Sequence, residues 1–131
     1  MLRTDDRGEP PRRRERTVAF RLGLSAETRA AALLLVKGFR IVARRWRSPV
    51  GEIDLVVRRG RLLVFVEVKA RGAFDDAAEA VTERQRRRIA AAAEAWLASH
   101  ADDLDRDIRF DAVLVAPWRV PRHIPAAFDV T

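Results

Sequence analysis

Residues 51–69 read GEIDLVVRRGRLLVFVEVK, and this stretch decides the fold. Two runs rich in Val, Leu, Ile and Phe, residues 53–58 and 61–69, lie on either side of Arg59-Gly60. Apolar runs that flank a short glycine-containing turn predict a β-hairpin. The second run is apolar on both faces until Glu67, which is typical of a central strand covered on both sides.

The sequence before this hairpin predicts a helix and a further strand. Ser25 is suited to cap the N-terminus of a helix that ends before Gly38. The apolar stripe of this helix is formed at helical spacing by Ala26, Ala30, Ala31, Leu33 and Leu34. Residues 39–44 follow as a predicted strand, and residues 45–50, which include Pro49, are expected to form a loop.

The sequence after the hairpin predicts a second helix and a last main strand. Thr82 and Gln85 fit the capping box, in which Ser or Thr is followed three residues later by Glu or Gln. One face of the helix that follows carries Ile89, Ala92, Ala93, Trp96 and Leu97. Residues 108–116 are apolar enough for a strand, and three prolines are expected to break up the tail beyond it.

These elements follow one another as α-β-β-β-α-β. A helix between the third and fourth strands implies that these two strands are parallel, so we expect an α/β fold with a mixed central sheet flanked by helices. Residues 17–131 are expected to form a single domain. Residues 1–16 hold six Arg, four acids and two Pro, and are predicted to be a disordered basic leader.

Composition excludes several classes of protein. The chain has 131 residues, of which 48% are hydrophobic, and it contains no cysteine. A disulfide scaffold, a thiolate nucleophile and a cysteine-based zinc site are therefore excluded. No apolar run approaches the roughly 18 residues that cross a bilayer, and the N-terminus lacks the apolar core of a signal peptide. We expect a cytoplasmic protein that does not act at a membrane.

The charge of the chain favours a polyanionic partner. Lys and Arg number 26 against 19 Asp and Glu, which gives a net charge of +7. Such a surplus points first to nucleic acid, with DNA as the leading candidate, and second to an anionic membrane surface. Of the basic residues 24 are Arg, and the two lysines are Lys37 and Lys69. Each lysine is of interest, because Arg can neither give up a proton nor act as a compact ammonium.

Two carboxylates and one of these lysines are placed together by their spacing. If the two strands pair about Arg59-Gly60, Asp54 lies opposite Phe65, and Glu67 is its diagonal neighbour on the same face. Lys69 points to that face as well, because side chains alternate along a strand. A register slip of one residue would destroy the arrangement, whereas a longer loop with the same register would keep it.

Asp54, Glu67 and Lys69 suit the hydrolysis of phosphodiesters. A divalent cation such as Mg²⁺ or Mn²⁺ takes oxygen ligands, activates water and polarises a phosphoryl oxygen. A nearby lysine can orient the water or stabilise the charge that develops in the transition state. The alternative is a salt bridge at the ends of two strands, of little energetic weight. An acid that follows an apolar run is costly without a purpose, which favours the metal site.

Residues 51–55, GEIDL, and 65–71, FVEVKAR, resemble the YraN-like family of small bacterial, endonuclease-like proteins. That family is placed in the PD-(D/E)XK, or restriction-endonuclease-like, superfamily, whose core has the same α-β-β-β-α-β order. The similarity covers most of the chain. It extends to Glu27 and to the stretches KGF at 37–39, RFD at 109–111 and HIPAAF at 123–128.

The resemblance implies a role for each residue of the motif. Asp54 and Glu67 would be metal ligands, with the backbone carbonyl of Val68 as a third, and Lys69 would be the catalytic lysine. Glu27 would be an accessory acid, although an acid is favoured in the first turn of any helix. Gln85 stands where many relatives carry a lysine. It is a further catalytic candidate, and the capping box explains it equally well.

Other residues are candidates for contacts with nucleic acid. Arg44, Arg45, Trp46 and Arg47 form a basic stretch with an aromatic residue, suited to phosphate contact and base stacking. The alternative is a solvated loop with Trp46 packed against the core. Further basic candidates are Arg71, Arg84 and Arg88. Asp111 is expected mainly to anchor an arginine, and His100 and His123 to cap or pack rather than to bind metal.

The leading hypothesis is a nuclease-like domain that uses Mg²⁺ or Mn²⁺ to cleave DNA or a branched or single-stranded nucleic acid. The rival hypothesis is a non-catalytic module for nucleic-acid binding or assembly that keeps the nuclease fold. A domain of this size has little surface with which to recognise a substrate, so either hypothesis leaves room for a homodimer or a protein partner. Binding without cleavage, insensitive to chelators, would favour the rival.

Overall fold

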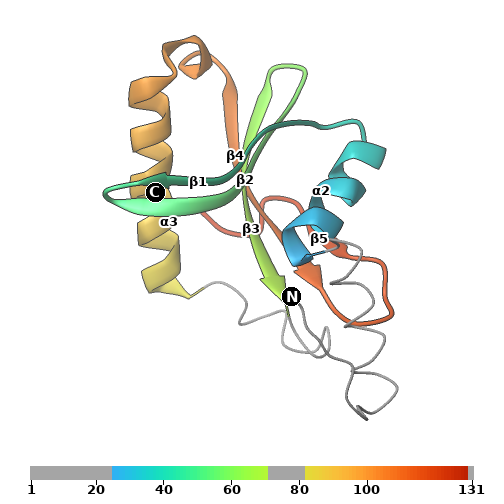
Figure 1. Ribbon diagram of the computed structural model, residues 1–131. Helices are drawn as coiled ribbons and strands as arrows, with labels where there is room; N and C mark the ends of the chain where they lie inside the picture. Colours follow the sequence, from blue (N-terminus) through green and yellow to red (C-terminus); the bar gives the residue numbers. More distant parts are fainter. Residues whose placement is uncertain (1–24, 71–81, 130–131) are drawn as a thin grey trace.

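The computed structural model describes residues 25–70 and 82–129. Along the chain its elements are α2 (Ala26–Val36), β1 (Arg40–Ser48), β2 (Gly51–Arg59), β3 (Leu62–Ala70), α3 (Glu83–Ser99), the 3-10 helix η2 (Ala101–Asp103), β4 (Asp107–Val115) and β5 (Arg122–Ile124) (Figure 1). The predicted order α-β-β-β-α-β is confirmed, and β5 is an addition to it. The predicted leader, residues 1–16, and Arg71 lie outside the described residues.

The five strands form one mixed sheet in the order β1-β2-β3-β4-β5. β3 and β4 are parallel, as predicted from the helix between them, and the other neighbouring strands are antiparallel. β5 was not predicted, because Pro121 and Pro125 flank it. These prolines lie just outside a three-residue edge strand, where a missing backbone donor costs little.

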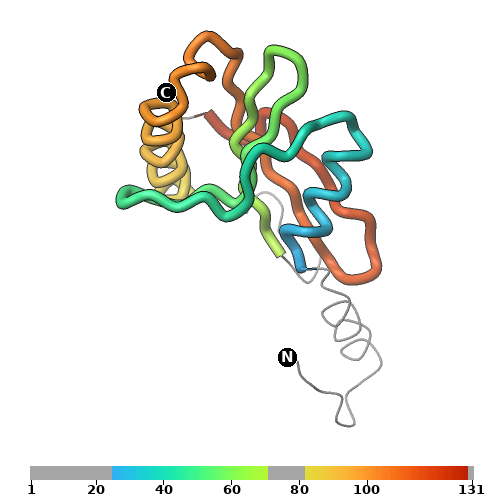
Figure 2. The backbone as a smooth tube through the Cα atoms, turned by 45° about the horizontal axis from the view of Figure 1, so that its top comes forward, coloured from blue at the N-terminus to red at the C-terminus, as the bar shows by residue number. Residues whose placement is uncertain are grey.

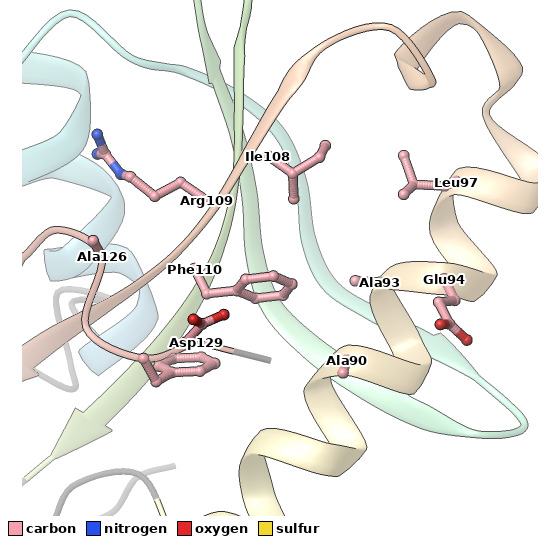
Figure 3. Close-up of a pocket in the computed structure, with 10 residues that line it drawn as sticks. Ala90, Ala93, Glu94, Leu97, Ile108, Arg109, Phe110, Ala126 and Asp129 are labelled. Atoms are coloured by element: carbon pink, nitrogen blue, oxygen red, sulfur yellow. The ribbon is translucent and has the colours of Figure 1, made fainter. Parts of the chain in front are cut away.

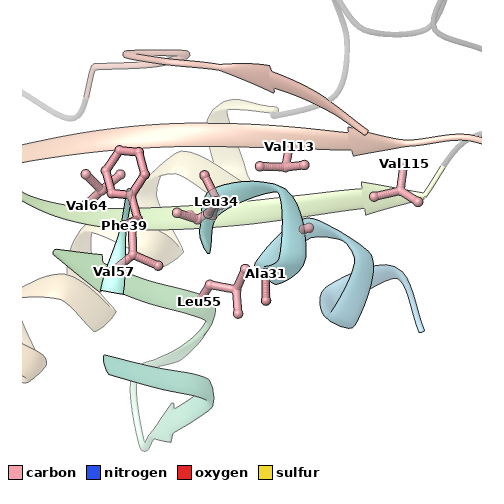
Figure 4. Packing of buried hydrophobic residues seen from close by; sticks show 10 residues of the cluster. Ala31, Leu34, Phe39, Leu55, Val57, Val64, Val113 and Val115 are labelled. Atoms are coloured by element: carbon pink, nitrogen blue, oxygen red, sulfur yellow. The ribbon is translucent and has the colours of Figure 1, made fainter. Parts of the chain in front are cut away.

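The two helices pack on opposite faces of the sheet. α2 buries Ala30, Ala31 and Leu34 in a cluster with Leu55, Val57, Val64, Val66 and Val113 (Figure 4). α3 buries Ile89, Ala92, Ala93 and Trp96 in a second cluster with Ile53, Val56, Leu63, Phe65 and Phe110. Residues 63–66 of β3 alternate between the two clusters, so β3 is the central strand, covered on both sides, that its sequence predicted.

The prediction of a loop at residues 45–50 is wrong for residues 45–48, which belong to β1. β1 continues to Ser48, and Trp46 pairs with Ile53, which leaves only Pro49 and Val50 for the turn. The arginines obscure the alternation of this strand, and its pairing with β2 decides its conformation instead. The β1–β2 hairpin reaches across to α3 (Figure 2), and Arg45, with φ of +52°, adds an irregularity within β1.

For the β2–β3 hairpin, the sequence predicted correctly which side chains share a face, but it did not predict which residues pair. Leu55 pairs with Val66 and Val57 with Val64. The same register continued by one residue brings Asp54 opposite Glu67 rather than Phe65. The error is two residues, and because side chains alternate with a period of two, Asp54 and Glu67 remain on one face.

Neither α2 nor α3, which are the two α-helices in the described ranges, is long and apolar enough to cross a membrane.

Candidate functional site

A small cleft opens where β2, β3 and the N-terminal half of α3 meet. We call it the acidic cleft; its volume is about 150 Å³ and it is lined by Glu52, Asp54, Glu67, Gln85, Arg88 and Ile89. Three of the predicted catalytic residues, Asp54, Glu67 and Gln85, are therefore brought together. Glu52 was not predicted, although its place two residues before Asp54 on a strand is a signal that could have identified it.

Asp54 is held by the backbone of the neighbouring strand. The N–H of Val68 donates a hydrogen bond of 2.8 Å to Asp54 Oδ2. Burial raises the pKa of Asp54 to about 7, and the charge of Glu67 and a hydrogen bond between the two carboxyl groups act in the same direction. The Val68 N–H lowers this pKa and only partly offsets the increase. The two carboxyl groups are therefore close enough to compete for one proton.

Lys69 adds a positive charge beside this pair. Its Nζ lies 2.9 Å from Glu67 Oε2, and the two side chains are only 11% and 15% exposed. Glu67 therefore contacts both Asp54 and Lys69, and the predicted convergence of Asp54, Glu67 and Lys69 is present in the structure. An ion pair this far from solvent is screened less than one on the surface.

Gln85 belongs to the capping box of α3 and also lines the acidic cleft. Its backbone N–H donates to Thr82 Oγ1 at 3.2 Å, and its side-chain oxygen accepts from the N–H of Thr82 at 3.0 Å. The predicted capping box is confirmed. Arg88, which is exposed and lies three residues further along α3, brings a positive charge to the same cleft.

Glu27 is not part of the lining of the acidic cleft, and its connection to the cleft is electrostatic. It is in the first turn of α2, which Ser25 caps as predicted, and it forms an ion pair of 3.4 Å with Arg45. Its charge also contributes to the raised pKa of Asp54, so it is within electrostatic reach of the pair.

The basic stretch of β1 is divided among several contacts. Arg44 donates to Thr28 Oγ1 at 2.7 Å, and Arg47 pairs with Glu52 at 3.2 Å. Trp46 packs edge-on against the buried Trp96, with 5.2 Å between ring centroids. This contact favours the core-packing interpretation of Trp46 over base stacking. Arg84 is exposed on the first turn of α3.

The donor set of the acidic cleft fits a hard divalent cation. Within the part of the chain that the structure describes, no group of three or more His, Asp or Glu side chains is arranged to hold a metal. Mg²⁺ is commonly bound through one or two carboxylates while it keeps several waters. Asp54 and Glu67 supply such a pair, and a cation between them would relieve the repulsion that contributes to the raised pKa of Asp54.

A larger hollow lies apart from these residues, between α3, β4 and the segment after β5 (Figure 3). Its volume is about 630 Å³ and its walls are mostly apolar, with Phe110 and Phe128 among them. It contains neither Asp54 nor Glu67, and the Arg109 side chain points away from it (Figure 3). Asp54 and Glu67 therefore line the smaller, polar cleft rather than this hollow.

Asp111 is fully buried and connects β4 to the tail. Arg109 donates two hydrogen bonds of 2.8 Å to its carboxylate, His123 Nε2 lies 2.7 Å away, and the N–H of Ala126 donates at 2.9 Å. Burial alone would raise the pKa of Asp111, but these hydrogen bonds together lower it to about 2. The predicted anchoring of an arginine is confirmed. His100 caps α3 and stacks on Trp96, and His123 packs edge-on against Phe39, so both histidines cap or pack as expected.

Comparison with known proteins gives the family of the chain. The matching family is described as "Uncharacterised protein family UPF0102", and the match covers residues 26–115. A UPF0102 protein of Rhodopseudomonas palustris strain BisB18 is 64% identical over 117 residues, which are 89% of this chain and 87% of that protein. One from strain BisB5 is 56% identical over 131 residues, 100% of this chain and 99% of the relative. Another, from Bradyrhizobium sp. strain ORS 278, is 61% identical over 117 residues, which are 89% of this chain and 83% of that protein. The chain therefore belongs to family UPF0102.

Proposed function

We propose that this protein is a metal-dependent, nuclease-like phosphodiesterase that acts on DNA or on a branched or single-stranded nucleic acid. The observation that carries the proposal is the meeting of Asp54, Glu67 and Lys69 at one end of β2 and β3. Membership of the restriction-endonuclease-like superfamily is part of the same proposal, and the parallel pairing of β3 with β4 across α3 is compatible with it.

Each residue of the cleft has a role in this proposal. Asp54 and Glu67 would hold Mg²⁺ or Mn²⁺, with the carbonyl of Val68 as a further ligand. Such a cation, when bound, lowers the pKa of water and neutralises phosphate charge. Lys69, whose Nζ lies 2.9 Å from Glu67 Oε2, stabilises the negative charge that develops on the phosphate. Gln85 positions the N-terminus of α3 at the cleft, and Arg88 attracts the phosphate backbone.

One observation favours the rival, a non-catalytic binding or assembly module. Lys69 pairs with Glu67, Gln85 pairs with Thr82, and Asp54 accepts a hydrogen bond from Val68, so each of the three side chains has a structural partner. Groups with such partners can support a fold without any turnover. A binding experiment and a cleavage experiment are therefore both needed.

The first test is titration with Mn²⁺ by calorimetry at neutral pH and low salt. We expect saturable binding to the wild type and its loss in Glu67→Gln, which keeps the shape of the side chain without its charge. Glu94→Gln, at an exposed position of α3 outside the acidic cleft, is the matched control and is expected to bind as the wild type does. Binding that persists in Glu67→Gln contradicts the metal site.

The second test is cleavage of labelled duplex, branched and single-stranded DNA in Mn²⁺. We expect the wild type to cut at least one of these substrates and Asp54→Ala to reduce the rate by at least about a hundredfold, because half of the carboxylate pair is gone. Cleavage that survives in purified Asp54→Ala would rule out the assigned site. Chelator-insensitive binding with no cleavage of any substrate would favour the rival module.

A further inference from the structure

Trp118 is an exposed tryptophan held in a strained conformation. The residue is 59% exposed, and its φ is +65°, a backbone conformation that residues other than glycine rarely adopt. The other two tryptophans, Trp46 and Trp96, pack against each other. Strain of this kind persists only where the surrounding structure imposes it, and it is concentrated at functional positions.

The loop that carries Trp118 is fixed from two sides. Pro117 and Pro121 restrict its backbone, and the guanidinium of Arg29 in α2 donates to the carbonyls of Ala116 at 3.3 Å and Arg119 at 2.6 Å. The indole is therefore presented to solvent by a braced loop between β4 and β5. A rigid exposed aromatic ring loses little entropy when it binds a flat partner.

This loop begins beside the strand end that carries Lys69. Val115, the last residue of β4, pairs with Ala70, the last residue of β3. Trp118 is three residues further along, at most about 11 Å of chain. In Figure 1 the arrowheads of β3 and β4 point to the same end of the molecule, and the connection to β5 leaves from there.

The first turn of α2 contacts both β1 and the loop and lies within electrostatic reach of Asp54. Glu27, which is within electrostatic reach of Asp54, pairs with Arg45, and Arg44 contacts Thr28. Arg29, the next residue, holds the Trp118 loop. Contacts of Arg45, Arg44 and Arg29 therefore lead from β1, through the first turn of α2, to the Trp118 loop.

The charge around Trp118 selects the kind of partner. Residues 112–128 contain no Asp or Glu, whereas Arg119 and Arg122 are both exposed. A cationic surface with an exposed aromatic ring is the arrangement that binds single-stranded nucleic acid, because the phosphates pair with the arginines and an unstacked base covers the ring. In a duplex the faces of the bases are stacked on one another and are not available.

We propose that Trp118 stacks on an unpaired base of a single-stranded segment whose backbone continues to the acidic cleft. The inference rests on the proposed function, since it names the substrate class of that same site. The protein thus acts on nucleic acid with a single-stranded portion rather than on continuous duplex.

The test uses the fluorescence of the full chain in EDTA, so that no cleavage occurs. Short oligo(dT) is expected to quench the wild type, because Trp118 is exposed while Trp46 and Trp96 are packed together. Fluorescence polarisation of labelled oligo(dT) is expected to show binding weakened about tenfold in Trp118→Ala and largely restored in Trp118→Phe. Leu104→Ala, which removes an equally exposed apolar side chain in the η2–β4 connection, is expected to bind as the wild type does.

Three results would overturn the inference. The first is that wild type and Trp118→Ala bind oligo(dT) with equal affinity. The second is that Trp118→Ala loses as much affinity for duplex DNA as it loses for oligo(dT). The third is a blue shift of Trp118 on vesicles of phosphatidylserine and phosphatidylcholine without any response to oligo(dT). Failure of the proposed function is distinguishable, because it appears as a wild type that cleaves nothing in Mn²⁺ whatever the stacking result.

Discussion

Lys69 determines how much negative charge the acidic cleft presents to a cation. Its ammonium lies 2.9 Å from Glu67, and both side chains are largely buried. The pair Asp54–Glu67 is therefore partly neutralised before any metal arrives, and a cation must compete with this ion pair for Glu67. The same ammonium is the group that would stabilise charge on a phosphate, so its two effects, on metal binding and on turnover, have opposite signs.

Lys69→Met is expected to separate these two effects. Methionine removes the ammonium while it keeps an unbranched side chain, so Mn²⁺ should bind a few-fold to tenfold more tightly, and cleavage should fall by at least about a hundredfold. Calorimetry and a cleavage assay measure the two quantities. Lys37→Met, at the second lysine, which contacts His123 outside the cleft, should change neither. Weaker Mn²⁺ binding by Lys69→Met would contradict a competition between the Lys69 ammonium and the cation for Glu67.

Gly51 sets how closely the β1–β2 hairpin approaches α3. A Cβ atom at this position would lie 2.8 Å from the carbonyl oxygen of Arg88 and 3.3 Å from Ala92 Cβ. Neither backbone can accommodate such a contact without a shift. Because Asp54 is three residues from Gly51 and Arg88 lines the same cleft, the separation of these two elements also sets the width of the acidic cleft.

Gly51→Ala is therefore expected to destabilise the protein by about 1–3 kcal/mol and to weaken Mn²⁺ binding at the same time. Gly60→Ala is the matched control. Its φ is +61°, so it also carries a cost in stability, but no atom lies within 4 Å of the added Cβ. Urea unfolding and calorimetry distinguish the two variants, since only Gly51→Ala should affect both. Unchanged Mn²⁺ binding in a destabilised Gly51→Ala would mean that the hairpin does not shape the cleft.

The elements that the sequence predicted well are those with local signals. Thr82 and Gln85 specify the start of α3 by themselves, and a period of two keeps Asp54 and Glu67 on one face despite the two-residue error in register. The course of β1 through residues 45–48 and the existence of β5 depend on partners distant in sequence. β5 is held by β4 and by the contacts of Asp111 with the tail, and no pattern within residues 117–128 indicates them.

At the scale of the whole molecule, the pH dependence of stability is set by buried aspartates whose pKa values are shifted in opposite directions. Asp111 and Asp103 are fully buried, which by itself raises the pKa of each, but hydrogen bonds, among them those from Arg109 to Asp111 and from Arg58 to Asp103, more than offset burial and lower both pKa values. Their contribution to stability is present above the pKa of an unfolded aspartate and is lost as the pH falls, for Asp111 from about 4 towards 2. Asp54 behaves in the opposite way, because its pKa in the folded protein is raised to about 7.

The raised pKa of Asp54 means that its carboxyl group binds a proton more tightly in the folded state than in the unfolded chain. Its contribution is therefore greatest below 3.8, the ordinary pKa of an aspartate, and is lost as the pH rises towards about 7. In a chelating buffer we expect the free energy of unfolding to fall between pH 5 and pH 8 by on the order of 2 kcal/mol more in the wild type than in Asp54→Asn. Asp102→Asn, at an exposed acid of η2, should follow the wild type.

Urea unfolding at the two pH values measures this difference, and Mn²⁺ links it to the proposed function. A cation that binds the ionised carboxylates of the folded state stabilises that state by an amount that grows with the ratio of the cation concentration to its Kd, so it should recover much of the loss at pH 8 in the wild type. It should recover little in Asp54→Asn, where one carboxylate is missing. A loss at pH 8 that Mn²⁺ leaves unchanged would separate the acid pair from metal binding. In that case Asp54 and Glu67 would be a structural, proton-sharing pair, which is the arrangement that the rival binding module requires.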